Sequence, residues 1–210
     1  MRTLGADLKF LLFTIFHPFE GFYELRFRRK RNWPLIVVLL LMVGIVEILG
    51  FYHIGMIARM SRGFYINPLF AITTSVFPFV LFAVSNWSVT TLFDGNGKLG
   101  DVFMVMAYAL APKIVLDLAF IGLSNIVTIP ELALLYAMVA AGYGIFVFLL
   151  FCGLCVAHEY NPAKCIVTIL ATIVSAVILV FIGAVYLILM GRLFGLITTV
   201  IAEITRRGLF

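Results

Sequence analysis

Long apolar stretches alternate with short polar ones along most of the chain. Five of these stretches run for more than twenty residues with few charged side chains. An α-helix needs about 20 apolar residues to cross the hydrocarbon core of a bilayer. The pattern therefore predicts an all-α fold, an integral membrane bundle of five transmembrane helices. The expected spans are 34–57, 67–93, 102–127, 130–157 and 163–191.

Shorter amphipathic segments are expected before and after the spans. Between residues 4 and 16 apolar side chains recur at helical spacing, but this segment is too short and too charged to span a bilayer. It predicts an N-terminal amphipathic interfacial helix that ends at His17-Pro18, because a residue before proline disfavours helix. Arg192 interrupts the last apolar run, so the amphipathic tail is expected to form a second interfacial helix. The predicted regions are therefore 1–32, 33–192 and 193–210.

Composition supports a membrane protein and adds a basic segment to it. The chain is 64% hydrophobic and 12% charged, whereas soluble domains are about 45–50% apolar and about 25% charged. The formal net charge is +5 and is concentrated near the start, where aromatic side chains interleave with the cations. This mixture suits the headgroup layer and predicts contact with anionic lipid headgroups or a plain topology anchor. Nucleic acid is not expected, because no folded basic domain would present these residues: Arg26, Arg28, Arg29, Lys30 and Arg31.

The distribution of positive charge also predicts an orientation. Cytoplasmic ends of spans carry an excess of Lys and Arg. With five spans, more of these residues fall on the side of the N-terminus than on the other side. A multi-pass protein of the cell membrane with a cytoplasmic N-terminus is therefore expected. The basic pair Arg206-Arg207 argues for the opposite placement of the C-terminus, so that end is less constrained.

Three ionisable residues fall deep inside the predicted spans. Glu47 lies in the first span, and Lys113 and Asp117 lie four residues apart in the third, on one helix face. Charges inside a bilayer are costly and are functional candidates by default. We expect the first and third spans to touch, with Lys113 held between the two carboxylates. The cluster is interpreted as a packing clip, with a proton or ion relay and an outward-facing hydrated pocket as alternatives.

The turn between the second and third spans is rich in aspartate and glycine. Asp94 and Asp101 are expected to be turn and cap residues rather than cation ligands, and Gly95 and Gly97 to supply positive φ angles. Asn86 precedes the turn within the second span and is expected to hydrogen-bond across helices. Prolines inside the second and third spans indicate kinks, with a functional hinge as the alternative.

Catalytic and metal-binding motifs are not found in the sequence. There is no HExxH, GxSxG, P-loop or post-strand GxGxxG pattern, which predicts a non-enzymatic protein without a cofactor. Cys152 and Cys155 have the CxxC spacing of zinc and redox sites, with His158 nearby. They lie in an apolar run, however, and are interpreted as small buried residues rather than metal ligands.

Four stretches together resemble the bacterial branch of the Yip1-domain family. In order they are HPFEGFYEL, NWSVTTLFDGNGKLGDVF, AYALAP and HEYNPAK, at 17–25, 86–103, 107–112 and 158–164. The resemblance implies five spanning helices, a cytoplasmic N-terminus and a C-terminus on the far side. Eukaryotic members associate with small Rab-type GTPases, but their DLYGP-type motif is missing here and that role is not carried over. Lys113 departs from the apolar or aromatic residue that usually follows the AYALxP pattern.

Two functions from different classes follow from these observations. The first is a non-enzymatic membrane scaffold, assembly factor or accessory subunit that binds a membrane-protein partner or a second copy of the chain. The second is a small transporter or channel that uses Glu47, Lys113 and Asp117. A water-accessible cavity at Lys113 would favour transport, and a dry, closed charge pair would favour the scaffold.

Overall fold

The computed structural model describes residues 4–29, 31–56 and 67–206. These residues form helices joined by short turns, and no strand occurs among them. Five helices are long and apolar enough to cross a membrane. The all-α bundle with five transmembrane helices is therefore confirmed, with ends within a few residues of those predicted except at the C-terminus. The spanning helices are α3 (Trp33–His53), α5 (Pro68–Leu92), α6 (Leu99–Leu123), α7 (Leu132–His158) and α8 (Pro162–Arg206).

Asparagine followed closely by proline begins three of the spans. The side-chain oxygen of Asn67 accepts the backbone N–H of Leu69 at 2.9 Å, and that of Asn161 accepts the N–H of Lys164 at 2.8 Å. Asn32 caps α3 in the same way, with a longer bond of 3.4 Å. Proline is favoured in the first helical turn, where a backbone N–H has no helical partner. An asparagine cap and a nearby proline therefore define where each of these three helices starts.

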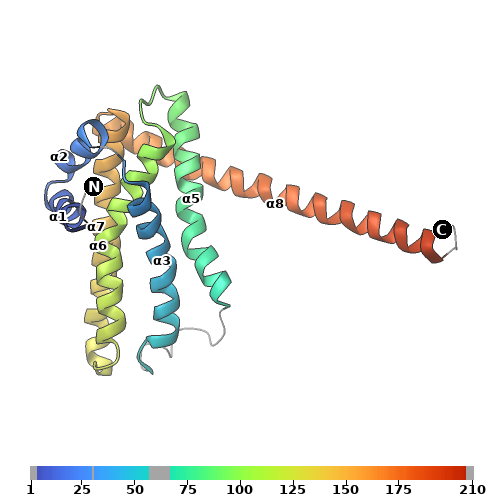
Figure 1. Ribbon diagram of the computed structural model, residues 1–210, viewed down its shortest axis with the longest axis horizontal. Coiled ribbons are helices and arrows are strands. Elements are labelled where there is room, and N and C mark those ends of the chain that lie inside the picture. The colour runs from blue at the N-terminus through green and yellow to red at the C-terminus, as the bar shows by residue number, and fades with distance from the viewer. Residues whose placement is uncertain (1–3, 30, 57–66, 207–210) are drawn as a thin grey trace.

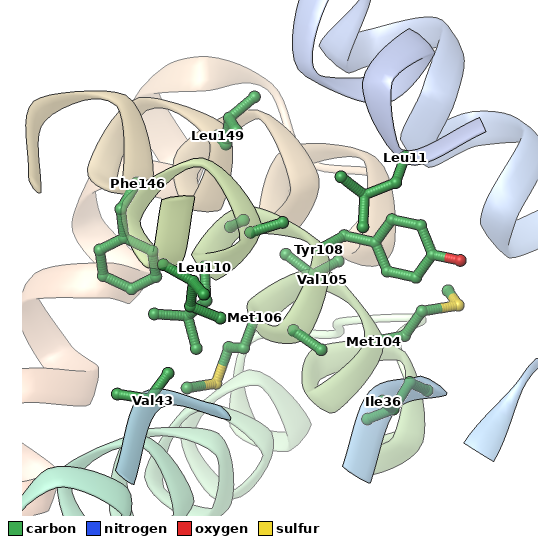
Figure 2. Close-up of a cluster of buried hydrophobic side chains, with 14 of the residues drawn as sticks. Leu11, Ile36, Val43, Met104, Val105, Met106, Tyr108, Leu110, Phe146 and Leu149 are labelled. Carbon is green, nitrogen blue, oxygen red and sulfur yellow. The ribbon is translucent and has the colours of Figure 1, made fainter. Parts of the chain in front are cut away.

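Helix α6 lies at the centre of the bundle and packs against α3, α5 and α7 (Figure 1). Its middle is rich in alanine, and small side chains let neighbouring helices approach closely. Between Val102 and Pro112 all but one side chain are buried. Figure 2 shows Met106 and Leu110 of α6 meeting Val43 of α3 and Phe146 of α7. Pro78 and Pro112 lie inside helices that continue past them, and a hinge at either stays a hypothesis.

The N-terminal segment folds onto the outside of this bundle. Helix α1 (Leu4–Phe16) has the predicted bounds and is followed by α2 (Pro18–Tyr23) and by η1, a π-helical turn over Glu24–Arg28. α1 packs against α6, and α2 packs against α7. Phe22 is buried against Gly153 of α7, and Asp7 accepts a hydrogen bond of 2.9 Å from Asn32. The segment is therefore attached to the bundle by side-chain packing and by a side-chain hydrogen bond.

Helix α8 differs from the prediction. The expected break at Arg192 is absent, and one helix of 45 residues runs from Pro162 to Arg206. No proline follows Pro162, and glycine alone weakens a helix without ending it. Only Cys165, Thr168 and Thr172 of this helix are buried. Beyond them α8 leaves the other helices and extends away from the bundle (Figure 1).

The contact between Phe22 and Gly153 predicts that two glycine-to-alanine substitutions on α7 differ in their effect on stability. A Cβ at Gly153 would meet Val105 and, at 3.2 Å, the Phe22 ring, whereas a Cβ at Gly144 of the same helix meets nothing within 4 Å. We expect Gly153→Ala to lower the free energy of unfolding by about 1–3 kcal/mol through overpacking. Gly144→Ala should leave stability unchanged or raise it by up to about 1 kcal/mol, because alanine favours helix.

The three buried free cysteines provide the readout for this comparison. A thiol-reactive dye reports their exposure on heating, and detergent-induced unfolding gives the free energies. Equal stability of the two alanine variants would contradict the packing of α2 on α7.

Candidate functional site

A first polar region among the described residues lies at the end of the bundle where the N-terminal segment docks. Here the turn between α5 and α6, the turn between α7 and α8, and η1 come together. We call this region the motif cluster, because it gathers the predicted turn residues and the HEY sequence in one place. Its members are Arg26, Arg31, Asn86, Thr90, Gly95, Asn96, Gly97, Asp101, His158, Glu159, Tyr160 and Thr172.

Asn86 joins three helices in the motif cluster. It is 1% exposed, and its side-chain nitrogen donates to the hydroxyl of Thr172 in α8 at 3.1 Å. Its side-chain oxygen lies 3.1 Å from Nε2 of His158 at the end of α7. Because that oxygen can only accept, this hydrogen bond places a proton on Nε2. The expectation that Asn86 hydrogen-bonds across helices is confirmed.

The two glycines of the turn serve close packing. A Cβ at Gly97 would lie 2.7 Å from the ring of His158, and one at Gly95 would lie 2.6 Å from the Tyr160 hydroxyl. The expectation of positive φ angles at these glycines is wrong, since the left-handed residue in this turn is Asp94, with φ of 55°. Aspartate tolerates that conformation, so the glycines are required by lack of space rather than by backbone torsion.

Tyr160 closes the turn from the other side. Its hydroxyl donates to the backbone oxygen of Phe93 at 3.0 Å. Burial, and then the charge of Asp94, raise the pKa of Tyr160 above its ordinary value. The phenol therefore keeps its proton and remains a donor to this turn at neutral pH.

Asp101 has two structural partners in the motif cluster. One oxygen accepts the backbone N–H of Lys98 at 2.9 Å and so caps α6. The other oxygen forms an ion pair with Arg31, whose guanidinium lies 5.2 Å from the Trp33 ring. Asp101 is 7% exposed. Its predicted role as a cap is confirmed, and the ion pair with the basic segment is an addition that the sequence pattern did not indicate.

The members of the basic segment differ in how far other parts of the protein bind them. Arg26 donates to the backbone oxygens of Val156 at 2.9 Å and Asn96 at 3.2 Å, and forms an ion pair of 3.0 Å with Glu159. Its side chain is only 10% exposed. Arg26 and Arg31 are therefore bound by partners within the protein, and the position of the whole segment at the membrane surface stays a prediction.

The other members of the segment have different surroundings. Arg29 lies over the Phe10 ring at 3.4 Å and is paired with Glu24 at 3.6 Å. Arg28 is exposed. Lys30 lies outside the described residues. Backbone oxygens supply two of the contacts to Arg26, and such acceptors leave no side-chain signal in a sequence.

The second polar region lies within the spans, towards the opposite end of the bundle. Lys113 is 3% exposed, forms an ion pair with Asp117, and has its ammonium group 4.4 Å from the Tyr143 ring centre. These groups line a cavity of about 110 Å³ between α3, α6 and α7, which we call the charged cavity. Glu47 of α3 lines it as well.

The prediction for these deep charges is confirmed in part. The first and third spans do pack together, as α3 and α6. Lys113 and Asp117 do form a pair. Glu47 faces the same cavity, but among the described residues it forms no ion pair with Lys113 and no hydrogen bond. Lys113 is therefore held by one carboxylate and one aromatic ring, with the second carboxylate further away.

A layer of apolar side chains separates the two polar regions. On α6 the motif cluster ends at Asp101 and the charged cavity begins at Lys113, so the two are separated by about 18 Å of mostly buried helix. Val43, Met106 and Phe146 fill the same level from three helices (Figure 2). The arrangement allows hydrogen bonding and charge pairing at both levels, with these three buried apolar side chains between them.

The cysteines lie near the motif cluster. Cys152, Cys155 and Cys165 are free and buried, and Sγ of Cys165 lies 3.8 Å from the backbone oxygen of Phe151. Within residues 4–29, 31–56 and 67–206, no three His, Cys, Asp or Glu side chains gather closely enough to hold a metal ion.

Comparison with known proteins gives one family match. The sequence matches the Yip1 domain over residues 12–185, which is well over half of the chain. This range includes the motif cluster and the charged cavity, and ends within α8. No curated protein and no solved structure matches significantly.

The two carboxylates of the turn between α5 and α6 provide a matched test of the motif cluster. We expect Asp101→Asn to lower the free energy of unfolding by about 1.5–3 kcal/mol, because it weakens a charged cap and a partly buried ion pair together. Asp94→Asn should change it by less than about 0.5 kcal/mol, since Asp94 is exposed and asparagine accepts its left-handed backbone. Detergent-induced unfolding measures both. A similar loss in both variants would show that Asp101 has no special role.

The charged cavity generates a second comparison. Asp117→Asn leaves the ammonium group of Lys113 buried without its ion-pair partner, which should lower the free energy of unfolding by about 3 kcal/mol. Glu47→Gln should cost less than about 1 kcal/mol, because Glu47 has no such partner among the described residues. The same unfolding assay applies. If Glu47→Gln were the more damaging change, Glu47 and not Asp117 would be the main counter-ion.

Proposed function

The chain belongs to the Yip1-domain family, and from that membership we propose that it is a non-enzymatic membrane scaffold, assembly factor or accessory subunit. As a multi-pass helical protein it offers helix faces and a docked N-terminal segment to other membrane components. We place it in the bacterial branch of the family, on the four motif stretches and the missing DLYGP-type motif.

The observation that carries this proposal is that the motif residues bind segments of the protein to one another. Arg26 and Arg31 hold η1 and the start of α3 to the turns that follow α5 and α7. Asn86 and His158 join the ends of three spans. These polar groups are satisfied largely by one another. A network of this kind favours a fixed surface over a path for a moving substrate.

The N-terminal segment of α1, α2 and η1, which is bound to the bundle, is the surface that we propose for partner binding. Aromatic side chains with about half or more of their surface exposed lie along α1, α2 and η1: Phe16, Phe19, Tyr23 and Phe27. A groove of about 500 Å³ lies between this segment and Val156, and it is lined by two aromatic and three charged side chains: Phe19, Tyr23, Glu20, Glu24 and Arg28. Exposed aromatic rings beside charges are typical of both membrane interfaces and protein interfaces.

The same segment supports the proposed location and orientation. Arg28 is an exposed cation beside this aromatic face, and we assign it to anionic lipid headgroups. The basic segment and the excess of Lys and Arg on its side support a cytoplasmic N-terminus in the cell membrane. A membrane-protein partner, or a second copy of the chain, would then bind at the cytoplasmic leaflet.

A small transporter or channel remains the second candidate, and the charged cavity is the observation that favours it. Lys113, Asp117 and Glu47 place charge within the spans, where it is costly to keep. Against this candidate stands the apolar layer of Val43, Met106 and Phe146. Transport would require that layer to open.

Partner recovery tests the scaffold proposal. We expect Tyr23→Ala in the full-length protein to reduce specific co-purifying membrane proteins by at least about tenfold, because truncating an aromatic anchor commonly costs over 1.4 kcal/mol of binding. Trp87→Ala is the matched control, since Trp87 is a similarly exposed aromatic residue on α5. Quantitative mass spectrometry after mild solubilisation provides the measurement. Equal recovery with both variants would refute a role for this face.

Flux in proteoliposomes separates the two candidates. The scaffold proposal predicts that wild-type protein conducts cations and protons no faster than empty liposomes. A flux that disappears with both Lys113→Ala and Glu47→Ala would instead establish the transporter.

A further inference from the structure

The charged cavity is lined by two carboxyl groups and one ammonium group. Lys113 and Asp117 neutralise each other in their ion pair. Glu47 lines the same cavity and, among the described residues, has neither an ion-pair partner nor a hydrogen bond. An isolated carboxylate inside a bilayer is costly unless it is protonated or meets a cation. The cavity therefore contains a carboxyl group with no ion-pair partner of its own among the described residues.

Aromatic rings in the cavity are suited to hold a positive charge. Tyr136 and Tyr143 are seven residues apart on α7 and so lie on one helix face. The Tyr143 ring already faces an ammonium group, that of Lys113, at 4.4 Å. The ring centres of Tyr136 and Phe120 are 5.8 Å apart, and both residues line the cavity beside Glu47. Aromatic faces attract cations, and paired rings are a known means of binding organic ammonium groups.

Position and size restrict what can enter the charged cavity. Glu47 is six residues before the end of α3, and Asp117 is six residues before the end of α6, so both lie about 9 Å from the ends of their helices. Gly50, one turn after Glu47, is buried in the wall and adds no side chain. A cavity of about 110 Å³ holds several water molecules, but it is small beside drug-sized pockets of about 300–1,000 Å³.

We propose that the charged cavity binds a small organic ammonium group, held between the carboxylate of Glu47 and the rings of Tyr136 and Phe120. The apolar walls suit the carbon atoms next to the nitrogen, which an inorganic cation does not have. The group could belong to a lipid headgroup that reaches in from the nearby membrane surface, or to a soluble amine. This site goes beyond the scaffold function, which needs no small ligand.

The wild-type protein tests the chemistry directly. Full-length protein in a neutral detergent is titrated with tetramethylammonium chloride, and with sodium chloride at equal ionic strength, while the buried cysteines report thermal unfolding. A ligand that binds only the folded state raises the unfolding temperature in proportion to its binding. In a second arm, native mass spectrometry compares phosphatidylethanolamine with phosphatidylglycerol of the same acyl chains.

Variants localise the binding to the cavity. We expect Glu47→Gln to weaken binding of the preferred probe by at least about tenfold. Tyr136→Leu, which keeps all charges, should weaken it as well. Asp94→Asn, which removes an exposed carboxylate from the turn between α5 and α6, should leave it unchanged.

Each result decides the proposal. Stabilisation by tetramethylammonium beyond that by sodium, lost in Glu47→Gln, supports it with a soluble amine as the source. Retention of phosphatidylethanolamine alone, lost in the same variant, supports it with a lipid as the source. Equal responses to both salts together with no preference between the lipids would overturn it, and so would a preference that survives both Glu47→Gln and Tyr136→Leu.

Discussion

Polar groups inside this bundle must be satisfied by the protein itself, because the hydrocarbon core of a bilayer offers them no water. The motif cluster meets most of this requirement with charged and amide side chains that reach across chain turns, although Arg31 Nε and His158 Nδ1 have no hydrogen-bond partner within the described residues. Arg26 binds two backbone oxygens and a carboxylate, and Asn86 binds two side chains from other helices. Segments more than a hundred residues apart are thereby fixed to one another at a single end of the bundle.

The bundle keeps its charges at two separate levels. At the docked end, Arg31 and Asp101 combine charge pairing with helix capping. Within the spans, Lys113 and Asp117 are four residues apart on one helix and form an ion pair, with the Tyr143 ring of α7 beside the ammonium group. The central helix α6 contributes to both levels, and its alanine-rich middle keeps them apart. Rigidity at one end and a charged cavity towards the other are therefore built from the same helix.

Much of the fold could be predicted from the sequence, because membrane spans are defined by length and hydropathy. The pair of Lys113 and Asp117 was predictable because both lie on one helix. The distance of Glu47 from that pair was not, since it depends on how α3 and α6 rotate about their axes. The burial of Arg26 was missed because backbone oxygens hold it. The continuity of α8 was missed because an arginine in an apolar run resembles a boundary, although nothing in the backbone ends the helix there.

Helix α8 is a rod that is held near one of its ends. Its last buried residue is Thr172, which accepts the hydrogen bond from Asn86, and about 51 Å of helix follows before Arg206. A rod fixed in this way converts rotation into displacement. A change of about ten degrees in tilt at Thr172 would move the distal end by about 9 Å over that length. The hydrogen bond between Asn86 and Thr172 therefore lies close to the point about which α8, the longest described helix, would tilt.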